Sequence, residues 1–188
     1  MSSRCAHSLT IVMGDGWQDE PRLGDLVFRA DTLTRIQVCA AWQHRLETGL
    51  NRRALTDFHA RHKYLLMAHN PVQYKVLGKL LATLHQNDPA ELGPRYFRAL
   101  MSALQQQATR GTHANVLQHL SGYFKHRISR EDKQYLHRAI EQYRQGLAPL
   151  RVPLSLLRHH VRHHPDPYVA QQVYLQPHPE HLSLRKAM

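Results

Sequence analysis

Apolar residues along most of this chain recur every three or four positions, which is the spacing of one face of an α-helix. No segment shows the alternation of apolar and polar residues that a half-buried β-strand requires. The pattern therefore predicts an all-α fold. We expect a compact bundle of about seven helices, over residues 31–48, 51–69, 71–86, 89–108, 112–125, 129–146 and 153–164, with a short final helix from Asp166.

Capping residues and helix breakers set the expected boundaries of these helices. Asp31 is expected to cap the first helix and Gly49 to end it. Ser129, followed by two acidic residues, is typical of a helix start, and Thr112 is expected to begin the helix before it. The pair Gly93–Pro94 leaves open whether the fourth helix runs through or restarts there.

Glycine and proline interrupt both ends of the chain. Gly14, Gly16, Pro21 and Gly24 break every element that residues 1–30 would form, so an irregular leader is expected there. Pro177 and Pro179 predict an extended C-terminal tail. With 188 residues and 42% hydrophobic residues, the chain suits one domain with a packed core, so residues 31–188 are expected to form a single all-α domain.

Composition excludes several classes of protein. No stretch approaches the roughly 18–20 apolar residues of a membrane span, and acidic residues arrive too early for a signal peptide. Cys5 and Cys39 give no disulfide framework and no metal-ligand spacing, so we expect a cytoplasmic protein.

The charge is basic and unevenly distributed. The chain has 25 Lys and Arg against 14 Asp and Glu, a net charge of +11. No acid occurs between Glu91 and Glu131, and two further acid-free runs lie at 58–87 and 142–165. Surface charge that serves only solubility normally mixes both signs, whereas uncompensated cations attract polyanions by releasing counterions. The runs therefore favour a nucleic acid or another polyanion as partner.

The helix expected over 112–126 has two distinct faces. Val116, Leu117, Leu120 and Phe124 form its predicted core side, and Asn115, His119, Gly122 and His126 lie opposite them. This uncharged stripe would offer hydrogen bonds to RNA, or it would pack against a neighbouring helix with its polar groups satisfied internally. Tyr123, at the boundary, would stack on a base or pack within the fold.

Two further groups of histidines each have a structural and a functional interpretation. His59, His62 and His69 share a face with leucines, which is typical of buried histidines, while Lys63 lies at the rim and would reach outward. His159 with His163, and His160 with His164, form two pairs four residues apart on a helix, a spacing that suits zinc or nickel. Arg158 and Arg162 on the same helix would repel a cation, so a basic surface is the better interpretation and no metal is expected.

Motifs of catalysis are weak. The chain has no glycine-rich phosphate loop and no His-Glu-x-x-His motif, and carboxylates for paired acid–base chemistry are scarce. We expect no cofactor and no catalysis by this chain alone. A histidine-dependent enzyme and a protein-interaction module that docks an acidic partner stay open as alternatives.

Four segments resemble the YbgA-like family, a bacterial helical domain of unknown function. They are ALTDFHARHKYLLMAHNP from Ala54, THANVLQHLSGYFKHRIS from Thr112, YRQGLAPLRVPLSLLRHHV from Tyr143 and PDPYVAQQVYLQPHP from Pro165. The resemblance covers roughly Asp31 to Arg185 and does not include the leader.

The resemblance implies an accessory role in RNA chemistry. Members occur alone or fused to a thiouracil-desulfidase-type domain with an iron–sulfur cluster, which implies removal of sulfur from 4-thiouridine in tRNA. The two cysteines here are too few to ligate such a cluster. What the resemblance leaves for this chain is the accessory role: it is expected to bind RNA, with tRNA as the RNA and a separate iron–sulfur desulfidase as its partner.

The matched segments and the basic runs supply the expected nucleic-acid-binding residues. Phosphate pairing is expected for Lys63, Arg110, Arg144, Arg158 and Arg162, and hydrogen bonding or stacking for His59, His113, Asn115, His119, Tyr123 and His159.

Overall fold

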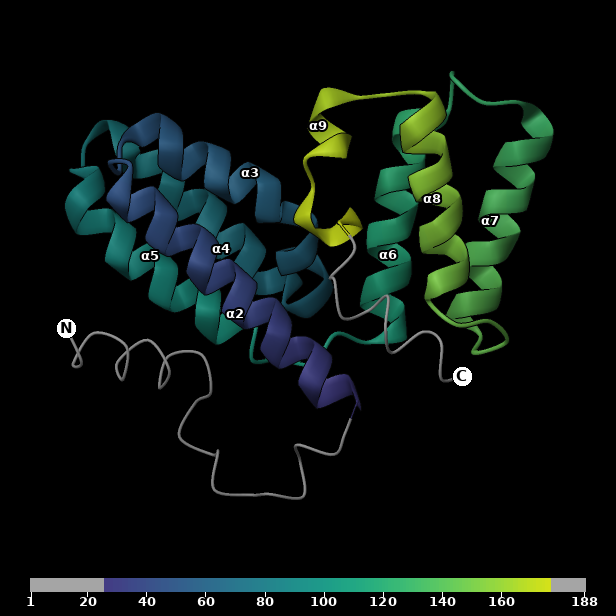
Figure 1. Cartoon of the computed structure of the whole chain (residues 1–188), viewed down its shortest axis with the longest axis horizontal. Coiled ribbons are helices and arrows are strands. Elements are labelled where there is room, and N and C mark those ends of the chain that lie inside the picture. Colours follow the sequence, from purple (N-terminus) through teal and green to yellow (C-terminus); the bar gives the residue numbers. More distant parts are fainter. Residues whose placement is uncertain (1–25, 177–188) are drawn as a thin grey trace. The chain divides into compact units, whose positions relative to one another are not determined.

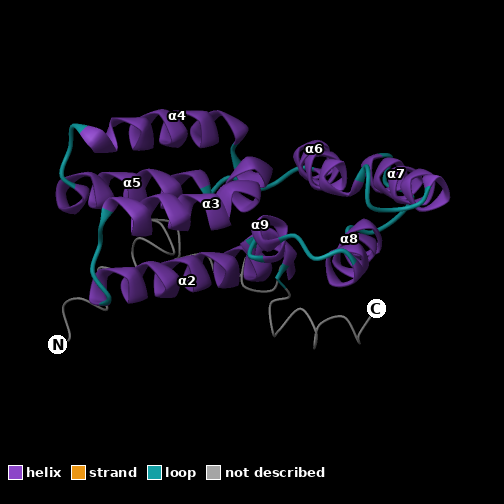
Figure 2. Cartoon of the chain, turned by 90° about the horizontal axis from the view of Figure 1, so that it is seen from above, coloured by secondary structure: helices purple, strands orange, loops and turns teal. Residues whose placement is uncertain are grey.

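The computed structural model describes the backbone of residues 26–176 and the side chains from Asp31 onward. All the regular elements of this part of the chain are helices, which confirms the predicted all-α class (Figures 1 and 2). Residues 1–25 of the expected leader and the tail from Pro177 lie outside the described residues. None of the helices over 26–176 combines the length and apolar composition of a membrane span.

The chain forms two compact units. Within the described residues, unit 1 contains 26–59 and 72–107, and unit 2 contains Ala60–Pro71 and Ala108–Gln176. The boundary falls inside one helix, α3 (Arg52–His69), so this helix supplies residues to both units. Whether residues 31–188 behave as a single domain therefore stays a prediction.

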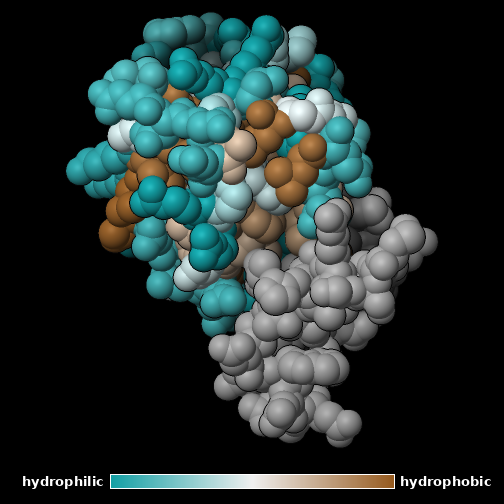
Figure 3. Space-filling model, turned by 90° about the vertical axis from the view of Figure 1, so that its left-hand side faces the viewer, coloured by the Kyte–Doolittle hydropathy of each residue, from teal (hydrophilic) through white to brown (hydrophobic). Residues whose placement is uncertain are grey.

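Unit 1 consists of four helices and a short 3-10 turn. These are α2 (Leu26–Glu47), the first half of α3, α4 (Pro71–Ala82), η2 (Thr83–His85) and α5 (Pro89–Ala103). Trp42 on α2 stacks on Phe97 of α5 with ring centroids 4.8 Å apart and meets the edge of Phe58 of α3 at 5.2 Å. The face of this unit seen in Figure 3 is mainly hydrophilic with small separate apolar areas, as expected when the large rings turn inward.

Unit 2 is built around three helices joined by short loops. They are α6 (Arg110–Ser121), α7 (Arg130–Arg144) and α8 (Arg151–His163), which pack against one another with α7 antiparallel to its neighbours (Figures 1 and 2). The turn η3 (Gly122–Phe124) extends α6, and α9 (Pro167–Ala170) and η4 (Val173–Leu175) follow α8. Gln172 is fully buried and donates from Nε2 to the carbonyl oxygens of Ala60 and Tyr168 at 3.0 Å each.

Most predicted helix ends are confirmed by their capping contacts. The side chains of Asp88, Ser129 and Asp166 each accept a backbone N–H of the helix that follows. Gly49 and Gly146 follow α2 and α7 with φ of 98° and 84°, a left-handed conformation that glycine adopts without a Cβ clash.

Three predicted starts differ from the structure, and the helix near Gly93–Pro94 runs through without a restart. Helix α8 begins at Arg151, which places Pro153 within its first turn. Helix α2 begins at Leu26, so Asp31 lies inside it, because neither Gly nor Pro interrupts residues 26–30. Helix α6 begins at Arg110, since Thr109 caps the backbone N–H of Thr112 and the Thr112 side chain accepts the N–H of Thr109 in return.

We predict that Trp42→Ala lowers the free energy of unfolding by about 3–5 kcal/mol. The substitution removes a side chain that is 3% exposed and that joins α2 to α3 and α5. Denaturant unfolding followed by circular dichroism measures the change. Gln43→Ala, an exposed position on the same helix, is the matched control and changes the value by less than about 0.5 kcal/mol. Equal effects of the two substitutions would show that Trp42 does not organise unit 1.

Candidate nucleic-acid interface

Ten of the eleven residues predicted to bind nucleic acid lie in unit 2, and His59 lies in unit 1. The His59 side chain is half-buried. Its Nδ1 atom lies 3.1 Å from the hydroxyl oxygen of Tyr96, and its ring stacks on Tyr74 with centroids 5.8 Å apart. His59 is therefore held within the packing of unit 1, which matches the buried-histidine interpretation of this helix face.

Most of the net charge of the protein belongs to unit 2. This unit has twelve Lys and Arg against four Asp and Glu, a net charge of +8, whereas the rest of the chain has thirteen against ten, or +3. Helix α7 holds three of the four acids and is nearly neutral, at +1. The fourth acid, Asp166, is paired with Arg127 at 3.4 Å. The excess positive charge of unit 2 therefore lies outside α7.

Helix α8 presents the most regular row of cations. Its inner side is formed by the buried residues Leu154, Leu157 and His160. A second row lies on the side away from them and contains no acid; we name it the α8 stripe, and its members are Arg151, Ser155, Arg158, His159 and Arg162. Arg151, Ser155, His159 and Arg162 are exposed and Arg158 is half-buried. From Arg151 to Arg162 the stripe is about 16 Å long.

Arg151 and Ser155 were not among the residues predicted from sequence. The signal was present, because both lie at helical spacing from Arg158 and opposite Leu154 and Leu157. Arg158 is partly engaged within the fold, since its Nε–H donates to the carbonyl oxygen of Leu175 at 2.7 Å. The predicted position of the cations away from the core side is therefore confirmed most fully at the two ends of the stripe.

The polar stripe predicted on the 112–126 segment is exposed. Asn115, His119, Gly122 and His126 all face solvent, whereas Val116, Leu117, Leu120 and Phe124 have no exposed surface. The helical projection thus assigned the two faces correctly. Because these four residues are exposed, their hydrogen-bonding groups are accessible to a ligand.

Three other predicted residues have partners inside unit 2. Tyr123 accepts a hydrogen bond from the Tyr64 hydroxyl at 3.3 Å and stacks on Tyr168 with centroids 5.9 Å apart. Arg144 forms a two-pronged pair with Glu141, and the bond from its Nη2 atom is 2.6 Å long. The hydrogen bond from Arg144 lowers the pKa of the Glu141 carboxyl, and the pair offsets part of the positive charge of Arg144. Lys63 is half-buried, with its Nζ atom 5.1 Å from the centre of the Tyr64 ring.

Among the predicted residues, His113 has the pKa that differs most from its ordinary value. Its Nδ1 atom lies 2.8 Å from the hydroxyl oxygen of Tyr174, and the ring meets the edge of Tyr143 with centroids 6.2 Å apart. Burial, and next the nearby His69, lower the pKa of His113 to about 4, so its imidazole is neutral at physiological pH. Burial likewise raises the pKa of Tyr174 above its usual value.

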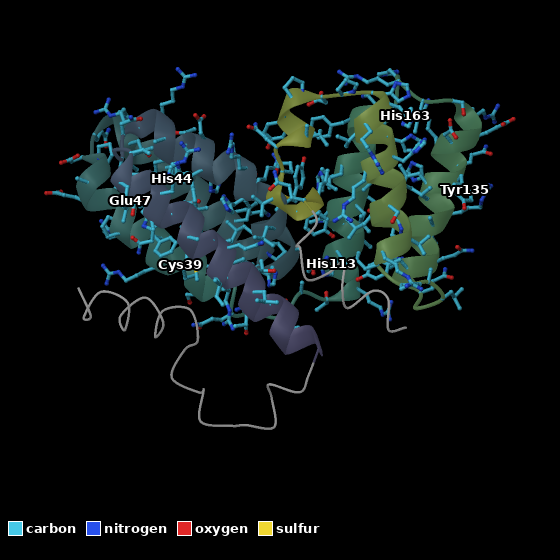
Figure 4. The ribbon with its side chains drawn as sticks, viewed as in Figure 1. Cys39, His44, Glu47, His113, Tyr135 and His163 are labelled. Atoms are coloured by element: carbon cyan, nitrogen blue, oxygen red, sulfur yellow. The ribbon has the colours of Figure 1, made fainter. Side chains whose placement is uncertain are left out.

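Arg110, in the first turn of α6, lies beside Tyr143. Its guanidinium lies 5.3 Å from the centre of the Tyr143 ring, and its Nη1 atom donates to the Tyr143 carbonyl oxygen at 3.2 Å. Figure 4 shows His113 at the end of α6 where that helix begins, whereas His163 lies at the opposite end of unit 2 on α8.

The four histidines near the end of α8 differ in burial, and His164 is half-buried. His160 is buried and its ring centroid is 5.9 Å from that of Phe124, whereas His159 and His163 are exposed with centroids 4.1 Å apart. No group of three or more His, Cys, Asp or Glu side chains suited to a metal ion occurs in the part of the chain that the structure describes.

Comparisons with known proteins agree with the resemblance seen in the sequence. Residues 63–179 match the family described as "Protein of unknown function (DUF1722)". The chain is also 35% identical, over 160 residues, to the uncharacterized protein YbgA of Escherichia coli strain K12, and the match covers 84% of this chain and 95% of that protein. The chain therefore belongs to the YbgA-like family, for which these comparisons give no function. No solved structure matches it.

We predict that the stability of the protein falls as the pH is lowered from about 6.5 to 4, in part because of His113. Above pH 6.5 the imidazole is neutral in both states, but below it the unfolded chain binds a proton that the folded chain resists until about pH 4. The full difference is about 3 kcal/mol. Denaturant unfolding at pH 7 and pH 4 measures it.

The comparison with His113→Asn isolates this contribution, because asparagine retains a polar atom near the Tyr174 hydroxyl but does not titrate. The variant loses less stability than the wild type over the same pH range. The exposed control His137→Asn retains the wild-type slope. Identical slopes for the wild type and His113→Asn would contradict the assignment of a low pKa to His113.

Proposed function

We propose that this protein binds RNA through the basic surface of unit 2 and serves as an accessory module that presents tRNA to a separate 4-thiouridine desulfidase. The observation that carries the RNA-binding part is the α8 stripe, which combines three arginines, a serine and a histidine with no acid on the same helix. The tRNA and desulfidase parts rest on the family resemblance.

The charge of the stripe supports a polyanion as ligand. Arg151 and Arg162 are exposed at its two ends, and its length of about 16 Å spans several phosphates of one nucleic-acid strand. Guanidinium groups pair with phosphate oxygens through two parallel hydrogen bonds, which Ser155 and His159 supplement as smaller donors. Contacts of this kind recognise phosphates and helix shape rather than base sequence, which suits a folded RNA.

The exposed stripe on α6 supplies a second kind of contact. Asn115, His119 and His126 carry side chains that donate and accept hydrogen bonds, and Gly122 lets a ligand approach the backbone closely. Such groups read sugar hydroxyls and unpaired bases. The proposed interface therefore combines phosphate contacts from α8 with hydrogen bonds from α6.

We predict that the double substitution Arg151→Ala and Arg162→Ala weakens tRNA binding about tenfold or more at low salt. Two lost phosphate contacts also reduce the slope of log affinity against log salt concentration by about 1–2. Fluorescence anisotropy with labelled tRNA between about 50 and 200 mM salt measures both quantities.

The matched control is Arg95→Ala with Arg98→Ala, which removes the same charge from exposed positions of α5 in unit 1. This control retains most of the affinity and salt dependence. Absence of tRNA binding at about 50 mM salt, or equal losses in the two double variants, would refute the proposal. Capture of an acidic protein that survives nuclease treatment, without tRNA binding, would instead favour the protein-interaction alternative.

A further inference from the structure

The outward side of α2 is exposed to solvent and carries no charged residue over residues 36–44. It lies opposite the buried Val38, Cys39 and Trp42 of the same helix. We name this surface the α2 face, and its exposed members are Ile36, Gln37, Ala40, Ala41, Gln43 and His44. None of the six is a Lys, Arg, Asp or Glu.

Apolar residues occur on both sides of α2. On the outward side, 45% of the surface of Ile36 is exposed, and Ala40 follows one turn further along. A helix that only covers a core normally has charged residues on its outer side, as α5 has with Glu91, Arg95 and Arg98. Exposed apolar side chains contribute little to the folding of unit 1 alone, so this composition is typical of a face that a partner covers.

The α2 face lies on the outside of unit 1. Figure 2 shows α2 on one side of the layer formed by α3 and α5, with α4 on the other side of that layer. The inward side of α2 is occupied, since Trp42 contacts Phe58 of α3 and Phe97 of α5. The outward side, from Ile36 to His44, is about 12 Å long and can be reached by another molecule.

The charge of the chain decides which partner suits this face. An acidic protein would be attracted to the 25 Lys and Arg residues of the chain, and none of them lies on the α2 face. A second copy of the chain has the same net charge of +11 and is repelled wherever two basic surfaces meet. On an uncharged face, two copies can meet without placing like charges against each other.

We propose that two copies of this protein associate through the α2 face, with their α2 helices antiparallel around a two-fold axis near Ala40 and Ala41. The small side chains at the axis let the two helices approach closely. Gln37 of one copy then lies opposite His44 of the other, and an amide and an imidazole can form a hydrogen bond there. Antiparallel helices also bring opposite ends of their dipoles together. The inference goes beyond the proposed RNA-binding function and does not depend on it.

The size of the α2 face sets the affinity that we expect. Interfaces of stable complexes bury about 800 Å² on each partner, and a single helix face about 12 Å long is smaller than that. Its contacts are apolar or neutral, so no charged pair adds to them. The dimer is therefore reversible, with a Kd of about 1–100 µM.

Analytical ultracentrifugation of the full chain between about 1 and 300 µM tests the proposal, without RNA. We expect the dimer fraction to rise with concentration. Raising the salt concentration from about 50 to 500 mM tightens the dimer severalfold, because salt screens the repulsion between two basic copies. The salt dependence of tRNA binding has the opposite sign, so the two proposals can fail separately. A chain that stays monomeric at about 300 µM in both salts would overturn the proposed dimer.

A matched pair of substitutions locates the interface. Ala40→Arg weakens the dimer by at least about tenfold, because it places two like charges beside the two-fold axis. Ala82→Arg adds the same charge at an exposed position of α4 and retains an affinity close to that of the wild type. Both positions are exposed and arginine favours helices, so both variants are expected to fold, which circular dichroism checks. Equal dimer affinities of the two variants would refute the α2 face as the interface.

Disulfide cross-linking tests the antiparallel arrangement. Gln37→Cys and His44→Cys, each combined with Cys5→Ser, would be oxidised separately and as an equal mixture; the remaining Cys39 is buried. We expect linked dimers to form at least about fivefold faster in the mixture, because a disulfide requires Cα atoms within about 7 Å and the axis brings Gln37 opposite His44 of the other copy. Equal rates in the mixture and in the separate samples would contradict the antiparallel dimer.

Discussion

The apolar sides of α6, α7 and α8 bury against one another, and this packing fixes where the charges of unit 2 lie. Leu117, Leu120, Leu136, Ile140 and Leu157 are at most 1% exposed. Because each helix has a single apolar stripe, its cations must lie on the other sides. On α7 they are balanced by acids of the same helix, whereas on α8 no acid is present. The basic surface is thus a consequence of the hydrophobic packing combined with the absence of acids from α8.

The cations of unit 2 fall into two groups with different physical settings. Arg151 and Arg162 are exposed and interact with solvent, which suits reversible contact with a phosphate backbone. Arg110 and Arg158 lie beside aromatic and carbonyl groups of the fold. The side chains of Arg110 and Arg158 are therefore more constrained by the fold than those of Arg151 and Arg162.

The helices and most of their ends could be predicted because their signals are local. Asp88, Ser129, Gly49 and Gly146 act within one turn of their own positions, and the structure confirms each of them. The start of α6 was predicted at Thr112, although Thr109 is also a capping residue by type. Only the reciprocal hydrogen bonds identify Thr109 as the capping residue.

The sequence by itself determined the all-helical class, the faces of α6 and α8, and the family. These follow from periodicity and from motifs that are contiguous in the chain. Only the tertiary structure decided which polar residues meet. His113 and Tyr174 are 61 positions apart, and their contact requires α6 and η4 to be packed in the same unit. The low pKa of His113 has the same origin, because desolvation depends on atoms that surround the imidazole in space and not on its neighbours along the chain.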